Sequence, residues 1–154
     1  MITPEFFDLE LYAIYKAIFE LIGERAWDVV WRSGEFVVNE LWEKLELEEA
    51  DIFEGLKKLA SFLSSSGYVK EIRVEKKGQD LAEYVMYEPV IAEGAKRLIE
   101  DGMVPPHVST SLMFALLKKK GYRAEMIGEP EFLKDGRVVE RWKLIRVQEE
   151  VKRS

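Results

Sequence analysis

The feature that most constrains the fold is the apolar segment from Gly23 to Trp42, which we interpret as one helix. Apolar residues cover most of its circumference, and a helix of this kind is normally central and packed on several sides. Ser33 and Gly34 interrupt it, although glycine inside a helix costs about 1 kcal/mol relative to alanine. The sequence therefore predicts a core helix in which these two residues either admit another backbone or keep a pocket open.

Composition places the chain among globular proteins. Its 154 residues, 47% hydrophobic and 34% charged, predict a single domain over 1–154 with a core at about 8–147. The absence of cysteine excludes disulfides and thiol catalysis, and one histidine, His107, cannot form a multi-histidine metal site. We therefore expect no metal and no cofactor. The many Glu and Lys residues, without Cys, are in keeping with a thermophile.

The charge pattern bears on partners and location. The formal net charge of −6 argues against nonspecific nucleic-acid binding. Residues 1–50 carry a net charge of −8 and residues 57–77 a net charge of +4. A solvated helix followed by a basic strand explains this contrast, and self-association through complementary patches is the alternative. Without a signal pattern or an apolar run of about 18 residues, we expect a cytoplasmic chain with no membrane span.

Hydrophobic periodicity gives the order of elements. Helices are predicted at 8–22, with Asp8 as its cap, at 23–42, and from Asp51 to about residue 63. A hairpin over 68–88 follows, then helices at 91–102 and 105–120, and a hairpin of strands 122–128 and 137–147. We expect the first two helices to form an antiparallel pair. The order ααα-ββ-αα-ββ predicts an α+β fold with helices packed on a four-stranded antiparallel sheet.

Two segments carry a family resemblance. Leu21-Ile22-Gly23-Glu24-Arg25-Ala26, followed by Val29 to Glu35, resembles the opening of the 4-vinyl-reductase-type small-ligand-binding domain. Pro106-His107, Leu116, Gly121 to Glu125 and Glu129 resemble its later helix-to-strand segment. That family is related by fold to subunits of the transport-particle tethering complex and to haem-based nitric-oxide sensors. The resemblance implies a non-catalytic domain that binds a hydrophobic or acyl-like small molecule, as a homodimer.

The sequence departs from this family where the family can hold zinc. Cysteines are common there near the start of the later helix and in the last hairpin, whereas this chain offers only His107 and, in the hairpin, Trp142. A zinc site is therefore not expected, and a lone histidine does not support haem. Near a helix N-terminus, His107 is expected to be a partly exposed polar residue whose protonated form the helix dipole disfavours.

Candidate ligand-binding residues are aromatic, small or polar positions near the central helix and in the later segments. They are Trp27, Trp31, Ser33, Gly34, Phe36, His107 and Trp142. Most aromatic residues of a chain belong to the core, which is the ordinary alternative for these. No phosphate loop, nucleophile elbow or HExxH motif is present, so we expect no enzyme activity.

Two further interpretations remain open. Residues 41–88 can be read as a winged-helix DNA-binding regulator whose wing is the 68–88 hairpin, although five acidic residues at 46–54 crowd the DNA-facing region. The first two helices carry extra aromatic area at Tyr12, Tyr15, Phe19 and Trp42. A large apolar surface usually marks an interface, so we also expect self-association through these helices.

Overall fold

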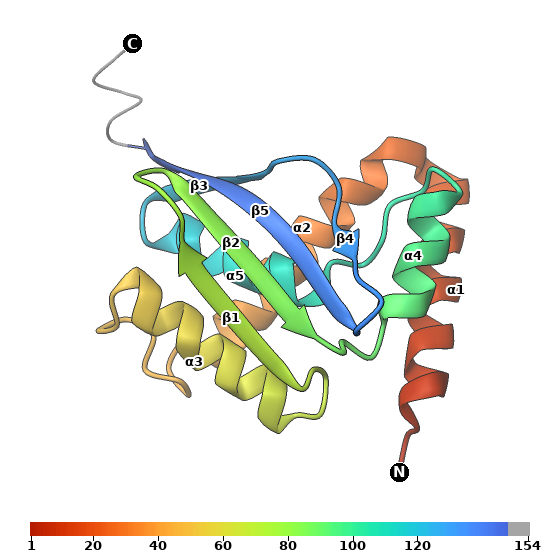
Figure 1. Cartoon of the computed structure of the whole chain (residues 1–154), viewed down its shortest axis with the longest axis horizontal. Coiled ribbons are helices and arrows are strands. Elements are labelled where there is room, and N and C mark those ends of the chain that lie inside the picture. The colour runs from red at the N-terminus through yellow and green to blue at the C-terminus, as the bar shows by residue number, and fades with distance from the viewer. Residues whose placement is uncertain (148–154) are drawn as a thin grey trace.

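The computed structural model describes residues 1–147, which form five α-helices and a five-stranded antiparallel sheet (Figure 1). The elements are α1 Pro4–Ile22, a 3-10 turn Gly23–Arg25, α2 Ala26–Leu41, α3 Ile52–Ser65, β1 Glu71–Lys76, β2 Leu81–Tyr87, α4 Ala92–Glu100, α5 Val108–Lys119, β3 Tyr122–Met126, β4 Glu131–Phe132 and β5 Arg137–Arg146. The predicted α+β class is confirmed. The sheet has one strand more than predicted, because the two-residue β4 pairs with β5.

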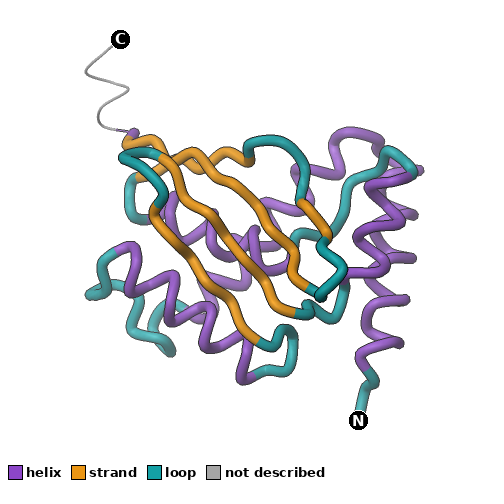
Figure 2. The backbone as a smooth tube through the Cα atoms, viewed as in Figure 1, coloured by secondary structure: helices purple, strands orange, loops and turns teal. Residues whose placement is uncertain are grey.

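The sheet has the order β1-β2-β5-β3, with β4 beside β5. Helices α3 and α5 pack on one face, and α2 lies on the outer side of α5, so α5 is enclosed between the sheet and α2 (Figures 1 and 2). The strands alternate accordingly: Tyr84 in β2 and Trp142 in β5 point inward and are fully buried. Helices α1 and α4 lie side by side at one end of the sheet.

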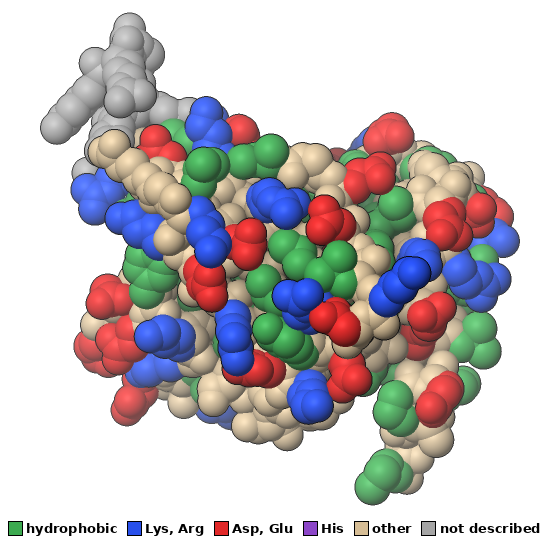
Figure 3. All heavy atoms as spheres, in the orientation of Figure 1, with side chains coloured by type: hydrophobic (Ala, Val, Ile, Leu, Met, Phe, Trp, Pro, Cys, Tyr) green, Lys and Arg blue, Asp and Glu red, His purple; other side chains and the backbone are tan. Residues whose placement is uncertain are grey.

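The other face of the sheet is open to solvent. Figure 3 shows Lys and Arg side chains interspersed with Asp and Glu across it, around a small hydrophobic patch. Strand β1 contributes Glu71, Arg73 and Glu75 at alternate positions. Strand β2 pairs with β5 along its whole length, so the hairpin interpreted as a wing is built into a sheet of mixed charge. The geometry that a winged helix requires is therefore absent from residues 41–88.

Helix α2 is buried along one stripe rather than on several sides. Its buried residues are Ala26, Val30, Gly34, Val38 and Leu41. The outward Phe36 is 72% exposed and Val37 is also exposed, so the prediction of a helix packed on several sides is wrong. The first two helices contact each other across the turn at Gly23, with Tyr15 of α1 in the same apolar cluster as Ala26 and Val30 of α2. Helix α1 nevertheless packs mainly on α4, which the sequence did not predict.

The helix caps differ from prediction at α1 and agree at α3. Thr3 caps α1 by accepting a hydrogen bond from the Phe6 amide at 3.2 Å. Asp8 instead accepts the Gly94 amide of α4 at 3.2 Å and thereby joins the two helices. Asp51 caps α3 as predicted. No helix within residues 1–147 combines the length and the apolarity that a membrane crossing requires.

Candidate functional site

Six rings in contact with one another run from the surface into the core, and we call them the aromatic row. They are Trp27, His107, Trp31, Phe114, Trp142 and Tyr84. Trp27 and Trp31 are one helical turn apart on α2, with ring centroids 5.7 Å apart. Phe114 of α5 stacks on Trp31 at 5.2 Å and meets Trp142 edge-on at 5.0 Å. The row therefore connects all three layers of the fold.

A buried carboxylate lies beside the row. The Glu140 side chain is 2% exposed. Its Oε1 accepts hydrogen bonds from Thr110 Oγ1 at 2.7 Å and from Trp142 Nε1 at 3.0 Å. Its Oε2 lies 3.5 Å from His107 Nδ1. Burying a carboxylate is costly unless donors surround it. The two hydrogen-bond donors come from α5 and β5, and His107, from the segment before α5, lies beside the other oxygen.

His107 is buried rather than partly exposed, so that prediction is wrong. It precedes α5 with the left-handed backbone angle φ 45°, after Pro105 and Pro106. This bend turns the ring inward, where it stacks on Trp27 at 5.3 Å between centroids. The His107 side chain is 5% exposed. Aromatic stacking and the buried carboxylate together hold the ring in one orientation.

A large cavity between α5 and β3, which we call the α5–β3 groove, has a volume of about 560 Å³. Its apolar lining includes Trp31, Phe114 and Met126. Charged residues that line it form exposed ion pairs: Lys118 Nζ lies 2.7 Å from Glu35 Oε1, and Arg123 pairs with Glu125. Ligand sites usually have volumes of about 300–1,000 Å³ and apolar walls, so this groove has the size and lining of a small-molecule site.

A second cavity, the Trp27 cavity, has a volume of about 380 Å³. Trp27 and His107 line it, together with Met126, which also lines the α5–β3 groove. Glu24 and Glu129 are its charged lining residues. Because Trp27 also stacks on Trp31, the two cavities are neighbours along the aromatic row.

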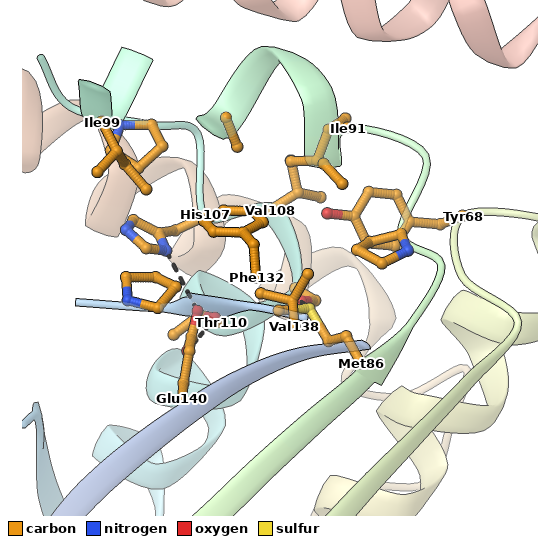
Figure 4. A pocket seen from close by; sticks show the side chains of 16 residues that line it. Tyr68, Met86, Ile91, Ile99, His107, Val108, Thr110, Phe132, Val138 and Glu140 are labelled. Atoms are coloured by element: carbon orange, nitrogen blue, oxygen red, sulfur yellow. Dashed lines mark hydrogen bonds and ion pairs between the residues drawn. The ribbon is translucent and has the colours of Figure 1, made fainter. Parts of the chain in front are cut away.

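A narrow crevice lies under α4, with a volume of about 30 Å³ (Figure 4). Apolar side chains such as Ile91, Phe132 and Val138 line it, and Glu140 and His107 meet on its wall. The volume admits a water molecule, which needs about 10–15 Å³, but no lipid chain.

Tyr68 also lines this crevice. Burial raises the pKa of the Tyr68 hydroxyl well above its ordinary value, and the nearby Glu140 adds to this shift. Tyr68 therefore remains protonated.

Three of the predicted site residues come together. Trp27 and Trp31 lie beside His107 in the aromatic row, and each lines one of the two large cavities. Trp142 is fully buried and joins the row through Phe114, so it supports the site from beneath without lining either large cavity.

The other three predicted residues lie elsewhere. Gly34 is buried where α2 crosses α5, and a β-carbon there would stand 2.7 Å from Ser111 Cβ and closer to the Ser111 carbonyl. Of the two predicted roles, close backbone approach is the one that the geometry supports. Ser33 is exposed on α2 and lies near the Tyr15 hydroxyl of α1, outside the cavities. Phe36 is solvent-exposed on the outer side of α2, away from the cavities.

Sequence reasoning missed Glu140, Thr110 and Phe114. A signal for Glu140 was available, because alternation in Val-Val-Glu-Arg-Trp places it on the same strand face as Val138 and Trp142. A carboxylate between buried apolar neighbours indicates a buried polar site. Among residues 1–147, no cluster of three or more His, Cys, Asp or Glu side chains could hold a metal ion.

No protein-family profile matches the sequence, and no curated protein is detectably similar to it. Its fold is similar to that of a trafficking protein particle complex subunit 3 from Naegleria fowleri, solved covalently bound to palmitic acid. The TM-score is 0.58, with 12% sequence identity over 93% of this chain and 95% of that chain. The predicted relation by fold to transport-particle subunits is therefore confirmed. The relation to 4-vinyl-reductase-type and haem-based domains remains a prediction.

Proposed function

We propose that the chain is a non-catalytic domain that binds an apolar small molecule, such as an acyl chain, in the α5–β3 groove. The observation that carries the proposal is a groove of about 560 Å³ between helix and sheet, lined by Trp31, Phe114 and Met126. Filling it removes apolar surface of both ligand and protein from water, which gives about 25 cal/mol per Å². The similar fold of a protein that carries palmitic acid supports this proposal.

Two features of the chain shape this binding. A thioester requires a cysteine thiol, and the sequence contains no cysteine, so binding of an acyl chain does not use a thioester. Lys118 and Arg123 at the groove already pair with Glu35 and Glu125. Covalent catalysis requires a nucleophile in contact with a base, and the described residues that line the groove form ion pairs instead. This arrangement supports binding rather than catalysis.

We also propose that the chain works in the cytoplasm as a homodimer formed through α1 and α2. The aromatic residues first expected at this interface are unsuitable. Tyr15 is buried, and Tyr12 and Phe19 pack partly against the same cluster. Trp42 lies beyond the end of α2 and packs partly against the main core. The outer faces of the two helices instead expose Phe6, Leu21 and Phe36. Large exposed apolar surfaces usually mark contacts between proteins.

Ligand binding is tested with dodecanol, a neutral probe that isolates the apolar contribution. Saturable quenching or enhancement of tryptophan fluorescence is expected, because Trp31 lines the groove. Ala124→Leu adds three heavy atoms to the β3 wall of the groove and is expected to weaken binding at least about tenfold, or about 1.4 kcal/mol. The matched control is Ala13→Leu on the exposed surface of α1. Equal dodecanol affinity in the two variants, or no binding by the wild type, contradicts the proposal.

A further inference from the structure

We propose that the Trp27 cavity binds a cationic nitrogen, so that the ligand is an amphiphile with an ammonium head. Its apolar chain lies in the α5–β3 groove and its head lies in the neighbouring cavity, beside His107, Glu24 and Glu129. The position of the chain rests on the proposed function. The identity of the head rests on the separate geometry of the Trp27 cavity.

Charge is the first argument. Glu24 and Glu129 line the cavity, and none of its lining residues is Lys or Arg. Residues 1–50, which include Glu24, carry a net charge of −8. A carboxylate or phosphate head placed here meets two like charges with no compensating cation, whereas an ammonium head meets two opposite charges. The cavity therefore discriminates between head groups by the sign of their charge.

The buried His107 is the second, independent argument. Its Nδ1 faces Glu140 Oε2 at 3.5 Å, while Thr110 and Trp142 occupy the other oxygen of that carboxylate. A carboxylate accepts only, so it favours the tautomer with the proton on Nδ1 and leaves Nε2 as an acceptor. Figure 4 shows the second ring nitrogen pointing away from Glu140.

No residue among 1–147 donates a hydrogen bond to His107 Nε2, and this atom is not among the buried polar atoms that lack a partner. It is the accessible edge of a ring whose side chain is only 5% exposed and which lines the cavity. Because Nε2 is an acceptor that reaches the cavity, a ligand N–H placed there can donate a hydrogen bond to it. The Trp27 ring and the Met103 and Met126 thioethers complete the wall. Tryptophan is the side chain that attracts organic cations most strongly. Acceptor, carboxylates and aromatic wall all favour a protonated amine.

The experiment compares dodecylamine, dodecanol and dodecanoate, which share one chain and differ only in the head. Affinities are measured by calorimetry on the full chain below the micellar concentration. Dodecylamine is expected to bind about tenfold more tightly than dodecanol, with dodecanoate the weakest. Dodecyltrimethylammonium, which has no N–H donor, is expected to bind less tightly than dodecylamine, and equal affinity overturns the role of Nε2 as acceptor.

Variants assign the preference to this cavity. Glu24→Gln combined with Glu129→Gln changes two exposed side chains and is expected to reduce the preference for amine over alcohol to about twofold or less. Glu125→Gln in the α5–β3 groove is the matched control and is expected to retain the preference. If the wild type binds dodecanol but shows no amine preference, this inference fails and the proposed function stands. If none of the three amphiphiles binds, both fail.

Discussion

Replacing Gly34 by alanine is the most direct test of how α2 and α5 pack. A β-carbon at this position would lie 2.7 Å from Ser111 Cβ and nearer still to the Ser111 carbonyl carbon and oxygen. Real β-carbons do not approach other heavy atoms within 3.0 Å. Because the obstructing atoms belong largely to the α5 backbone, no rotamer change relieves the contact. The two helices must separate instead.

Two opposing effects set the magnitude. Alanine favours a helix over glycine by about 1 kcal/mol. Overpacking a close-packed interior costs about 1–3 kcal/mol, occasionally more. We expect the upper part of that range, since helix separation also disturbs the Trp31–Phe114 stack at 5.2 Å. The net loss in unfolding free energy is therefore expected to be about 1–2 kcal/mol, with a melting temperature lower by about 2–8 °C.

Urea unfolding followed by tryptophan fluorescence gives the unfolding free energy. Gly55→Ala is the matched control, because the three atoms nearest to its β-carbon would all belong to the Leu116 side chain, the first at 3.0 Å. The end of a leucine side chain can shift, so this variant is expected to stay within about 1 kcal/mol of the wild type. If Gly34→Ala is as stable as the wild type, the glycine is not required by a backbone crossing and this reasoning is wrong.

Three further predictions concern the buried carboxylate, the α1–α4 contact and the interface. Thr110→Val removes the hydroxyl that donates to Glu140 at 2.7 Å and is expected to lower the unfolding free energy by about 1–3 kcal/mol. Thr110→Ser keeps a hydroxyl donor and is expected to retain most of the wild-type unfolding free energy. Burial raises the pKa of Asp8 despite its bond from Gly94, so ionisation of Asp8 lowers stability as pH rises above its unfolded pKa of about 3.9. Asparagine does not ionise, so the stability of Asp8→Asn minus that of the wild type is expected to rise with pH until Asp8 is ionised in the folded protein. Urea unfolding at several pH values measures this difference, and a difference that stays constant contradicts the prediction. Leu21 is 83% exposed, so Leu21→Glu is expected to shift sedimentation toward the monomer without changing the melting temperature.

Local elements were predictable because their signals are local. The Asp51 cap and the apolar stripe of α3 define that helix from its own residues. Alternation and turn residues located β1, β2, β3 and β5 in the same way. The pair Trp27 and Trp31 also follows from sequence, since residues four apart share a helix face. Strand β4 escaped prediction because two residues carry no periodic pattern and depend on pairing with β5.

Which helix is central was decided only by the tertiary structure. The sequence favoured α2 because it is rich in apolar residues, yet α5 is the enclosed helix, with Ser109, Thr110 and Ser111 all buried. Polar residues reduce the apolar periodicity by which a buried helix is recognised, so the sequence showed only a partial stripe here. Their burial is tolerated because other contacts satisfy them: Thr110 donates to Glu140 of β5, and Ser111 donates to the Val108 carbonyl.

The candidate site, too, was partly predictable from sequence and partly decided by the tertiary structure. The sequence alone established an aromatic pair on one helix, a single histidine, and a chain without cysteine. Only packing brings His107, from the segment before α5, within 3.5 Å of Glu140 on β5 and stacks its ring on Trp27 of α2. Periodicity reports which face of an element is apolar. It does not report which distant element supplies the partner of a buried polar group, because the order of layers determines that.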